Sequence, residues 1–358
     1  MSVGAEPRPG LRDIEVYDSP QLDVPVRLNT NECPHPLPED FMNELASTIR
    51  DLPLHRYPDG HMRRLLNDLA AASMHPVDGV WAANGSNEVL TELLQAYGGP
   101  GRRAAVFEPT YLLHSRLARL THTEVERLAL PGDFVLGDAE VAAVIASAPN
   151  VVFVCSPNNP TGNAQPLSAI VGIAQGLPNA LVIVDEAYGE FADYSAADLV
   201  ADDVPLVVVR TYSKVWSLAA VRLGFAVAPP WVIDELDKVL LPYALSVPTQ
   251  LAGTIALDFH SEMEKRVAAL VEERGRIFAA LSEMPGLSVV PSGANFLLVR
   301  VSGDAHDLWR RLLERGVLVR DFSSRPGVEG CFRITVGNPD ENDEFLAAIT
   351  AALPEVVT

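Results

Sequence analysis

The sequence is poor in lysine and in basic residues as a whole. Only three lysines occur among 358 residues, namely Lys214, Lys238 and Lys265. Lysine and arginine together number 27 against 47 acidic residues, which gives a formal net charge of −20. A chain this acidic is a poor candidate for binding nucleic acid, because that binding requires clustered basic side chains. Any chemistry that needs a lysine amine has only these three candidates.

Cysteines and long apolar runs are also scarce. Cys33, Cys155 and Cys331 are an odd number and lack Cys-x-x-Cys spacing, which argues against a disulfide framework or a cysteine zinc site. No apolar run reaches the roughly 18 residues of a membrane span, and the first ten residues lack the apolar stretch of a signal peptide. We therefore expect a cytoplasmic protein with reduced thiols and no bound metal.

Short apolar runs alternate with helical patterns through the first two thirds of the chain. Runs this short are typical of strands that are buried on both faces of a parallel sheet covered by helices. The alternation predicts an α/β fold with a parallel sheet. Six of the expected strands are Val80–Ala83, Ala104–Phe107, Val151–Val154, Leu181–Val184, Leu206–Val209 and Gly224–Val227.

The pattern divides the chain into three parts. We expect an extended N-terminal arm over residues 1–38, a large domain over 39–257 and a small α+β domain over 258–358. In the last part we expect a long charged helix at Ser261–Met284 and a shorter one at Asp304–Arg315, strands at Phe296–Arg300, Val317–Arg320 and Phe332–Val336, and a final helix from Asp340.

Polar residues follow several of the expected strands, where open α/β sheets bind their ligands. After the first run, Gly85 permits a tight turn, and Ser86 stands where a helix begins, which suits an anion. After the third run, Ser156–Gly162 combines two prolines with the amides of Asn158 and Asn159. Taken alone, an ordinary N-cap explains Ser86 and a plain turn explains the second segment equally well.

A carboxylate and a lysine follow two further strands. Asp185 comes directly after a buried run and needs a partner there, unless it is a simple helix N-cap. Lys214 lies at a strand end beside apolar Val215, whereas Lys238 and Lys265 lie on charged helix faces. Partial desolvation would lower the pKa of Lys214 and make it a usable nucleophile.

These residues together match the groups of pyridoxal 5′-phosphate. A helix N-terminus with Thr211, Ser213 and Arg222 suits its phosphate, and Asp185 suits its ring nitrogen. Asn159 and Tyr188 can hydrogen-bond its phenolic oxygen, and a lysine amine can form an imine with its aldehyde.

Specific motifs carry a resemblance to the fold-type I, aspartate-aminotransferase-like family, which implies a large domain with a mostly parallel, seven-stranded sheet between helices and a smaller α+β domain. More narrowly, the chain resembles the histidinol-phosphate aminotransferases within the class II aminotransferases, the actinobacterial branch in particular. The resemblance runs from about Leu11 to the final helix. The matching stretches are Leu28–Glu32, Arg56–Asp59, Gly85–Glu88, Ser156–Gly162, Asp185–Tyr188, Ser213-Lys214, Arg222–Gly224, Arg320-Asp321 and Arg333–Gly337.

The resemblance implies a role for each matching position. Lys214 would hold the cofactor covalently and move the proton during catalysis, and Asp185 would pair with the pyridine nitrogen. Tyr57 would reach the cofactor phosphate of a neighbouring subunit, which implies a homodimer. The other implied cofactor contacts are Gly85, Ser86, Asn87, Tyr111, Asn159, Tyr188, Thr211, Ser213 and Arg222, and the implied substrate contacts are Tyr17, Asn31, Arg320 and Arg333.

The resemblance implies an amino transfer between L-histidinol phosphate and 2-oxoglutarate, in histidine biosynthesis. Paired arginines can bind both the carboxylate and the phosphate of such substrates. Alternatively, Arg320 and Arg333 could have a structural role, in ion pairs with acidic residues of the small domain. Cys33, Leu112–His114, Trp216 and Ala220 depart from the usual pattern, and we expect none of them to touch the lysine chemistry.

Three alternatives stay open at this point, because this fold hosts many activities. One is a paralogous aminotransferase for aromatic or specialised-pathway amino acids. Another is a decarboxylase of a phosphorylated amino acid with the same cofactor. The third is a non-enzymatic binding protein, which would have no need of Lys214 or the two arginines.

Overall fold

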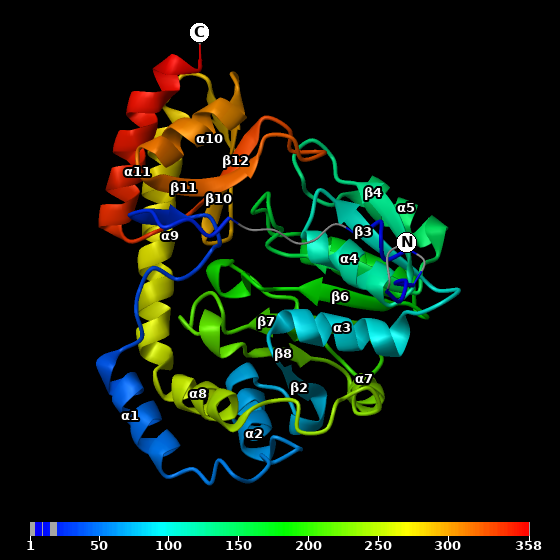
Figure 1. The fold of residues 1–358 in the computed structure, drawn as a ribbon. Coiled ribbons are helices and arrows are strands. Elements are labelled where there is room, and N and C mark those ends of the chain that lie inside the picture. Colours follow the sequence, from blue (N-terminus) through cyan, green and yellow to red (C-terminus); the bar gives the residue numbers. More distant parts are fainter. Residues whose placement is uncertain (1–3, 9, 15–19, 358) are drawn as a thin grey trace.

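The computed structural model describes residues 4–8, 10–14 and 20–357, and two β-sheets organise it (Figure 1). The larger sheet has seven strands in the order β2-β8-β7-β6-β5-β3-β4. Its strands are β2 (Val80–Ala83), β3 (Arg103–Glu108), β4 (Glu124–Ala129), β5 (Val151–Cys155), β6 (Leu181–Asp185), β7 (Leu206–Thr211) and β8 (Gly224–Val227).

The strand directions confirm the predicted mostly parallel sheet. The strands β4, β3, β5, β6 and β7 pair in parallel, and β8 runs antiparallel to both β7 and β2. The six apolar runs coincide with six of these strands. The seventh strand, β4, was missed because it lies at the edge of the sheet and has no apolar run, since three of its six residues are charged.

Helices cover both faces of this sheet. Along β5, Val151 and Phe153 pack with α3 and α7 on one face, whereas Val152 and Val154 pack with α5 and α6 on the other. This alternation follows from the period of two in a strand. The helices of this part are α2 (Arg63–Ser73), α3 (Ser86–Tyr97), α4 (Leu112–Leu120), α5 (Asp138–Ser147), α6 (Leu167–Gly176), α7 (Pro230–Leu236) and α8 (Val247–Asp258).

The smaller sheet has five strands in the order β1-β11-β12-β10-β9. These are β1 (Val26–Leu28), β9 (Leu287–Val289), β10 (Phe296–Val301), β11 (Val317–Phe322) and β12 (Cys331–Thr335). Strand β1 comes from the N-terminal segment and pairs in parallel with β11, so this segment contributes to the sheet of the C-terminal part. The domain division at residues 38 and 257 stays a prediction.

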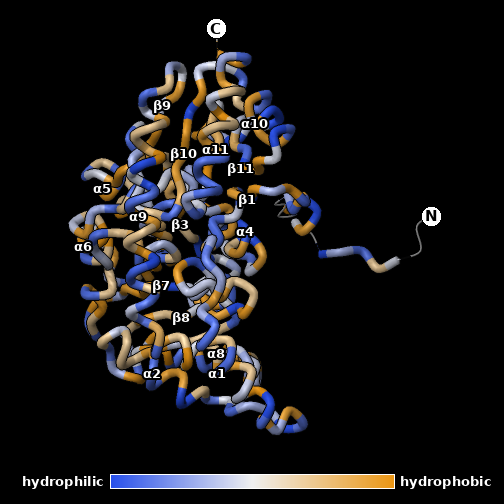
Figure 2. The backbone as a smooth tube through the Cα atoms, turned by 90° about the vertical axis from the view of Figure 1, so that its left-hand side faces the viewer, coloured by the Kyte–Doolittle hydropathy of each residue, from blue (hydrophilic) through white to orange (hydrophobic). Residues whose placement is uncertain are grey.

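Helix α9 (His260–Ser282) is the longest helix among the described residues, and it runs from the neighbourhood of α8 to the small sheet (Figure 1). The remaining helices are α1 (Glu39–Arg50), α10 (Ala305–Glu314) and α11 (Pro339–Ala352). Short 3-10 turns occur at Val77–Gly79, Gly189–Phe191, Ala197–Leu199, Ala219–Val221 and Leu353–Glu355. The first described residues extend away from the body of the molecule (Figure 2).

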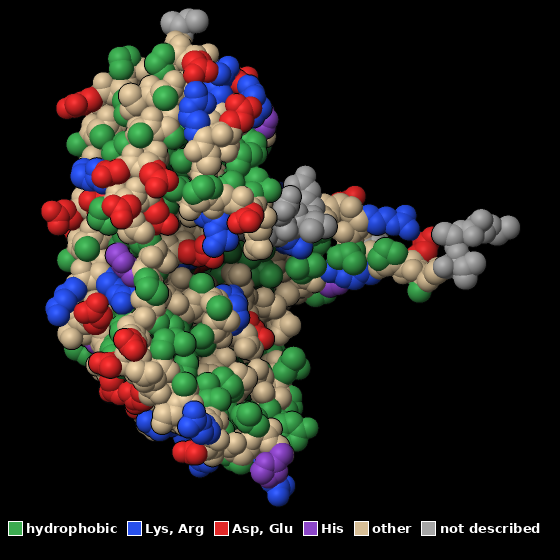
Figure 3. Space-filling view, turned by 60° about the vertical axis from the view of Figure 1, so that its left-hand side comes forward, with side chains coloured by type: hydrophobic (Ala, Val, Ile, Leu, Met, Phe, Trp, Pro, Cys, Tyr) green, Lys and Arg blue, Asp and Glu red, His purple; other side chains and the backbone are tan. Residues whose placement is uncertain are grey.

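Acidic side chains are spread widely over the face of the molecule shown in Figure 3. The two lysines expected at the surface are exposed, and Lys238 pairs with Glu235. In the described part of the chain, no helix combines the length and apolar character needed to cross a membrane. Cys33, Cys155 and Cys331 are free thiols.

Candidate active site

A cavity of about 540 Å³ lies where the carboxyl ends of β5, β6 and β7 face β11 and β12 of the small sheet. This is the position in which open α/β sheets bind ligands. Of the residues singled out in the sequence, the cavity is lined by Asn31, Ser86, Asn87, Tyr111, Asn159, Asp185, Tyr188, Thr211, Ser213, Lys214, Arg222, Arg320 and Arg333. Gly85 lies directly behind Arg222. Tyr57 does not line the cavity, and Tyr17 lies outside the described residues.

Lys214 extends into the cavity from the loop after β7. Its Nζ donates a hydrogen bond to the carbonyl oxygen of Thr30 at 3.0 Å and lies 5.8 Å from the centre of the Tyr188 ring. Burial of the amine, helped by the nearby charge of Arg333, lowers the pKa of Lys214 to about 8. An appreciable fraction of this amine is therefore neutral, and so nucleophilic, near neutral pH.

One end of the cavity is built to hold an anion. Arg222 Nη1 donates to Ser213 Oγ at 3.2 Å, and Thr211 Oγ1 lies 3.0 Å from the same hydroxyl oxygen. The N-terminus of α3 begins at Ser86 beside them. A Cβ on Gly85, whose φ is +83°, would lie 2.4 Å from Arg222 Nη2, so the turn packs tightly against the guanidinium. A guanidinium, two hydroxyls and a helix N-terminus suit a phosphate group.

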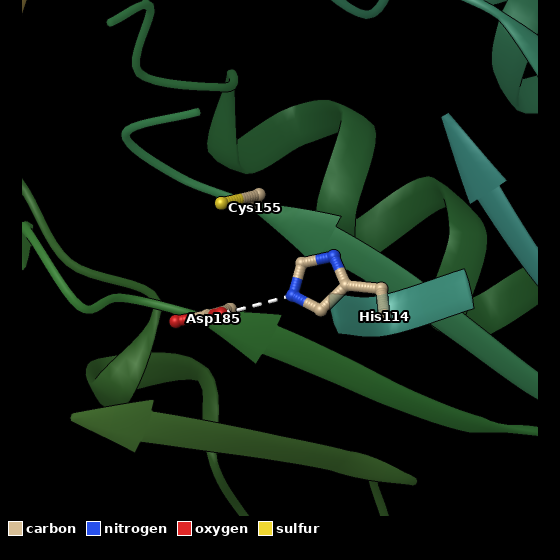
Figure 4. A group of neighbouring side chains, drawn as sticks. All are labelled: His114, Cys155 and Asp185. Atoms are coloured by element: carbon tan, nitrogen blue, oxygen red, sulfur yellow. Dashed lines mark hydrogen bonds and ion pairs between the residues drawn. The ribbon is translucent and has the colours of Figure 1, made fainter. Parts of the chain in front are cut away.

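Asp185 lies at the end of β6, with His114 beside it (Figure 4), and takes part in two hydrogen bonds. Its Oδ2 is 2.9 Å from Nε2 of His114, and its Oδ1 accepts from the backbone N–H of Ala187 at 3.1 Å. Both Asp185 and His114 are almost fully buried. The expectation that the Leu112–His114 segment does not touch the lysine chemistry stays a prediction, but no feature of the sequence indicated this contact between His114 and the carboxylate. One helical turn of α4 brings its ring directly onto the carboxylate.

Cys155 is the third member of this buried group and lies at the end of the neighbouring strand β5 (Figure 4). Side-chain atoms of His114, Cys155 and Asp185 that could bind a metal all lie within 4.8 Å of one another. Burial, together with the charge of Asp185, raises the pKa of the Cys155 thiol well above its usual range. The thiolate that a metal would require is thus disfavoured, so the group is better suited to hydrogen bonding.

The opposite wall of the cavity joins the two parts of the chain through Arg333. Its Nη1 donates to Asn159 Oδ1 at 2.6 Å, and its Nη2 donates to the carbonyl oxygen of Asn29 at 2.9 Å. Arg320 lies directly opposite Arg333 in the β11–β12 register, so both side chains belong to one face of the sheet. The contact with Asn159 shows that Arg333 reaches the large sheet.

Tyr188 is held in place beside this arginine. Its hydroxyl accepts a hydrogen bond from Asn31 Nδ2 at 2.8 Å and lies 3.4 Å from Asn159 Nδ2. Tyr111 contacts Asn87 through its hydroxyl at 3.4 Å. The expected ring contacts therefore surround one volume, with Lys214 on its wall.

The cavity is basic although the chain is strongly acidic. Its lining includes five cationic side chains against two acidic ones, Glu32 and Asp185. The cations are Lys214, Arg222, Arg320, Arg325 and Arg333. Such a concentration of positive charge in an acidic protein indicates substrates or cofactors that carry anionic groups.

A family model for "Aminotransferase class I and II" matches residues 24–349. The chain belongs to this aminotransferase family. Curated relatives named histidinol-phosphate aminotransferase include one from Mycolicibacterium smegmatis, which is 46% identical over 95% of this chain and 92% of its own length. Another, from Rhodococcus jostii, is 45% identical over 97% of this chain and 93% of its own length.

The fold of this aminotransferase is also similar to solved structures. Histidinol-phosphate aminotransferase from Sinorhizobium meliloti, solved in complex with pyridoxal 5′-phosphate, superimposes with a TM-score of 0.89 over 99% of both chains at 21% sequence identity. At this identity the likeness shows the fold. It confirms the predicted fold-type I architecture.

Sequence reasoning gave no role to two residues that the structure brings to the site of this aminotransferase: His114, which contacts Asp185, and Arg325, which lines the cavity. His114 lies 71 positions from its partner Asp185, so no local pattern links the two. Arg325 carries no motif signal and reaches the cavity from the loop between β11 and β12. Trp216, which departs from the family pattern, packs in the core, since it is 7% exposed and stacks on Tyr212.

Proposed function

We propose that this aminotransferase uses pyridoxal 5′-phosphate to transfer the amino group of L-histidinol phosphate to 2-oxoglutarate, giving imidazole acetol phosphate and L-glutamate. The observation that carries the proposal is the single cavity that combines a desolvated Lys214, a buried Asp185 and a wall of arginines. The curated relatives at 45–46% identity support the choice of substrate.

The residues present fit this cofactor. Ser86, Thr211, Ser213 and Arg222 would hold its phosphate, because they supply hydroxyls and a guanidinium at a helix N-terminus. The buried Asp185, fixed by His114, would pair with the ring nitrogen and favour its protonated form. When bound, the cofactor supplies a protonated ring that withdraws electrons from the reacting carbon of the substrate.

Further side chains would orient the ring. The hydroxyl of Tyr188 and the amide of Asn159 lie next to each other, and together they would contact the ring oxygen. Tyr111 lines the cavity near the start of α4 and would stack on the ring face, with Asn87 against its hydroxyl. Gly85 lets the turn approach Arg222 closely.

Lys214 would act as the base of the reaction. Its Nζ, neutral above a pKa of about 8, would hold the cofactor covalently and, once displaced by the amine of the donor, would be the base that accepts and returns a proton. The Thr30 carbonyl that accepts from Nζ fixes the direction of this amine. Asp185 is almost fully buried, whereas Lys214 is half-buried and lines the cavity, where a substrate can reach it.

Arg320 and Arg333 would bind the anionic groups of both substrates. A guanidinium can pair in the same way with the carboxylate of glutamate and with a phosphate monoester. The same pair can therefore serve both halves of a reaction in which donor and acceptor occupy the site in turn. Asn31 and Tyr17 would complete the substrate side of the cavity.

We further propose a homodimer in which Tyr57 completes the neighbouring site. Tyr57 is 80% exposed and lies away from its own cavity. Its ring stacks on Tyr243, with ring centres 4.5 Å apart and planes 13° from parallel. Leu54, close to Tyr57 in the sequence, and Leu241, close to Tyr243, are also strongly exposed, at 66% and 70%. Exposed apolar side chains of this kind are typical of surfaces that a partner covers.

The proposed function is tested by product analysis. The purified protein, loaded with pyridoxal 5′-phosphate, is incubated with L-histidinol phosphate and 2-oxoglutarate, and glutamate and carbon dioxide are both measured. We expect one glutamate for each donor consumed and no carbon dioxide. Release of carbon dioxide from a phosphorylated amino acid without glutamate would identify a decarboxylase. Turnover of aromatic amino acids but not of histidinol phosphate would identify a paralogous aminotransferase.

A further inference from the structure

The loop between β11 and β12, residues 323–330, brings a third arginine of the small-domain hairpin to the cavity wall. The loop has a defined shape, because Gly330 N–H donates to the carbonyl oxygen of Ser323 at 2.9 Å and Arg325 N–H donates to that of Phe322 at 3.0 Å. Val328 is fully buried and anchors the loop. Arg325 is therefore presented from an ordered turn.

The guanidinium of Arg325 and that of Arg333, the arginine expected to bind substrate, lie near the same aromatic ring and line the same cavity. Its Cζ is 5.6 Å from the centre of the Phe322 ring, and Cζ of Arg333 is also 5.6 Å from that centre. Phe322 itself is 8% exposed, so its ring is a fixed part of the wall. Two guanidinium groups on one aromatic ring place Arg325 and Arg333 in the same region of the cavity.

A hydrogen bond also links Arg325 to the large sheet. Its Nη2 donates to the carbonyl oxygen of Thr110 at 2.7 Å, directly before Tyr111. Close packing supports this contact, because a Cβ on Gly327 would lie 3.1 Å from Pro109 Cδ. One edge of the guanidinium is thus fixed by Thr110, while the residue still lines the cavity. The hydrogen bond to Thr110 orients the side chain, which is only half-buried.

The charges of the substrates give Arg325 a specific use. A carboxylate carries one negative charge on two oxygens, and a phosphate monoester carries up to two charges on three oxygens. The pair Arg320 and Arg333 can satisfy a carboxylate, whereas a phosphate has an additional oxygen and additional charge. The guanidinium of Arg325, in the same cavity, could pair with this additional oxygen and charge.

We propose that Arg325 is a further substrate-binding residue, which contacts the phosphate of the amino donor and favours phosphorylated over non-phosphorylated donors. The proposal rests on the proposed function, since it concerns the donor of that reaction. The alternative is a purely structural role, in which Arg325 only fastens the loop to Thr110. The two roles differ in which substrate loses affinity when the guanidinium is removed.

The test compares Arg325→Gln with wild-type holoenzyme. KM and kcat are measured for L-histidinol phosphate, and the glutamate half-reaction is measured separately. A third measurement, inhibition of that half-reaction by inorganic phosphate, needs no assumption about the donor. The matched control is Arg300→Gln, because Arg300 binds the same loop through the Glu329 carbonyl oxygen and does not line the cavity.

We expect Arg325→Gln to raise the KM for histidinol phosphate about tenfold, the size expected for one lost charge-assisted hydrogen bond. Inhibition by inorganic phosphate should weaken by a similar factor. The rate of the glutamate half-reaction should change less than twofold. The melting temperature should change by under about 2 °C. Arg325→Lys should recover part of the loss, and Arg300→Gln should leave all these constants close to wild type.

An equal loss with both substrates, accompanied by a lower melting temperature, would show that Arg325 only holds the loop. An unchanged KM for histidinol phosphate and unchanged inhibition by inorganic phosphate would also overturn the proposal. If wild-type enzyme turns over another donor but not histidinol phosphate, the proposed function fails. The phosphate inhibition then still decides whether Arg325 binds phosphate.

Discussion

Nε2 of His114 lies 2.9 Å from Oδ2 of Asp185, and both side chains are buried between α4 and the ends of β5 and β6 (Figure 4). The His114 ring is also stacked on Phe153, with ring centres 4.8 Å apart. The carboxylate therefore has a fixed orientation before any cofactor binds. Its position depends on a residue from a different element, which makes His114 a positioning residue for Asp185.

Replacing His114 with Phe should lower the catalytic rate, because Asp185 loses a hydrogen bond. The carboxylate would keep the Ala187 N–H and lose its other hydrogen bond in a buried position, which is costly. We expect kcat to fall by about one to two orders of magnitude and the visible absorption band of the bound cofactor to shift. Absorption spectra and steady-state rates of the loaded variant measure both effects.

His114→Gln provides the matched comparison, because its amide can still donate a hydrogen bond toward Asp185. It should recover a substantial part of the rate that His114→Phe loses. Equal rates and spectra in the two variants would show that the hydrogen bond to Asp185 has no part in the reaction.

The pKa of the Lys214 amine should lie well below that of an ordinary lysine. Burial lowers its pKa to about 8 from 10.5, so the amine is protonated and unreactive below that pH and becomes reactive above it. We expect labelling of the cofactor-free protein by an amine-directed reagent to show a midpoint near pH 8 at Lys214. Peptide mass spectrometry can follow all three lysines separately, with the exposed Lys238 as the internal control.

Arg333→Gln sharpens this prediction, because the charge of Arg333 contributes to the low pKa of Lys214. Its removal should move the labelling midpoint of Lys214 to higher pH and leave the profile of Lys238 unchanged. If Lys214 labels with the same pH profile as Lys238 in the unmodified protein, the amine is not desolvated as described.

Gly85→Ala should loosen the phosphate end of the cavity. The added Cβ would lie 2.4 Å from Arg222 Nη2, and the backbone at φ +83° disfavours any side chain. We expect at least a tenfold increase in the dissociation constant of pyridoxal 5′-phosphate, measured by titration of the cofactor-free protein.

The control for this substitution is Gly275→Ala in α9, where an added Cβ meets no atom within 4 Å. That change should leave cofactor affinity unaltered and stabilise the helix slightly, by about 0.5–1 kcal/mol. Wild-type cofactor affinity in Gly85→Ala would mean that the turn does not support the phosphate.

The place of Tyr57 can be tested with mixed dimers. Tyr57→Ala and Lys214→Ala should each be nearly inactive as pure proteins. If Tyr57 acts across the interface, a mixed dimer contains one site with both defects and one site with neither. We therefore expect mixing to restore activity, up to half that of wild type for each mixed dimer.

The stacking of Tyr57 on Tyr243 provides a further variant. Tyr243→Ala should reduce activity by releasing Tyr57, whereas Tyr243→Phe keeps the stacking and should be nearly normal. Absence of recovery in subunits shown to exchange would mean that Tyr57 acts within its own chain or has no role in the site.

Local sequence patterns predicted most of the strands and helices. The features that they did not predict depend on contacts between residues far apart in the sequence. Six apolar runs marked six strands, since burial on both faces makes a strand locally recognisable. Edge strand β4 lacks that pattern. The pairing of β1 with β11 joins Val26 to Val317, and no local feature of either segment specifies the partner.

The site shows the same division. Lys214 was singled out because lysine is rare and because its neighbours are apolar, and the cavity contains it. Arg325 is bonded to a carbonyl 215 positions away, so only the folded loop reveals its place. The roles of individual residues in catalysis rest on chemistry that the variants above address.

The central claim is that one site accepts the amino group of histidinol phosphate and passes it to 2-oxoglutarate. The most direct measurement mixes holoenzyme with L-histidinol phosphate in the absence of any oxo acid and follows the visible cofactor band. We predict that the band disappears and that later addition of 2-oxoglutarate restores it with formation of glutamate. A band that histidinol phosphate leaves unchanged, while another amino donor bleaches it, would contradict the account.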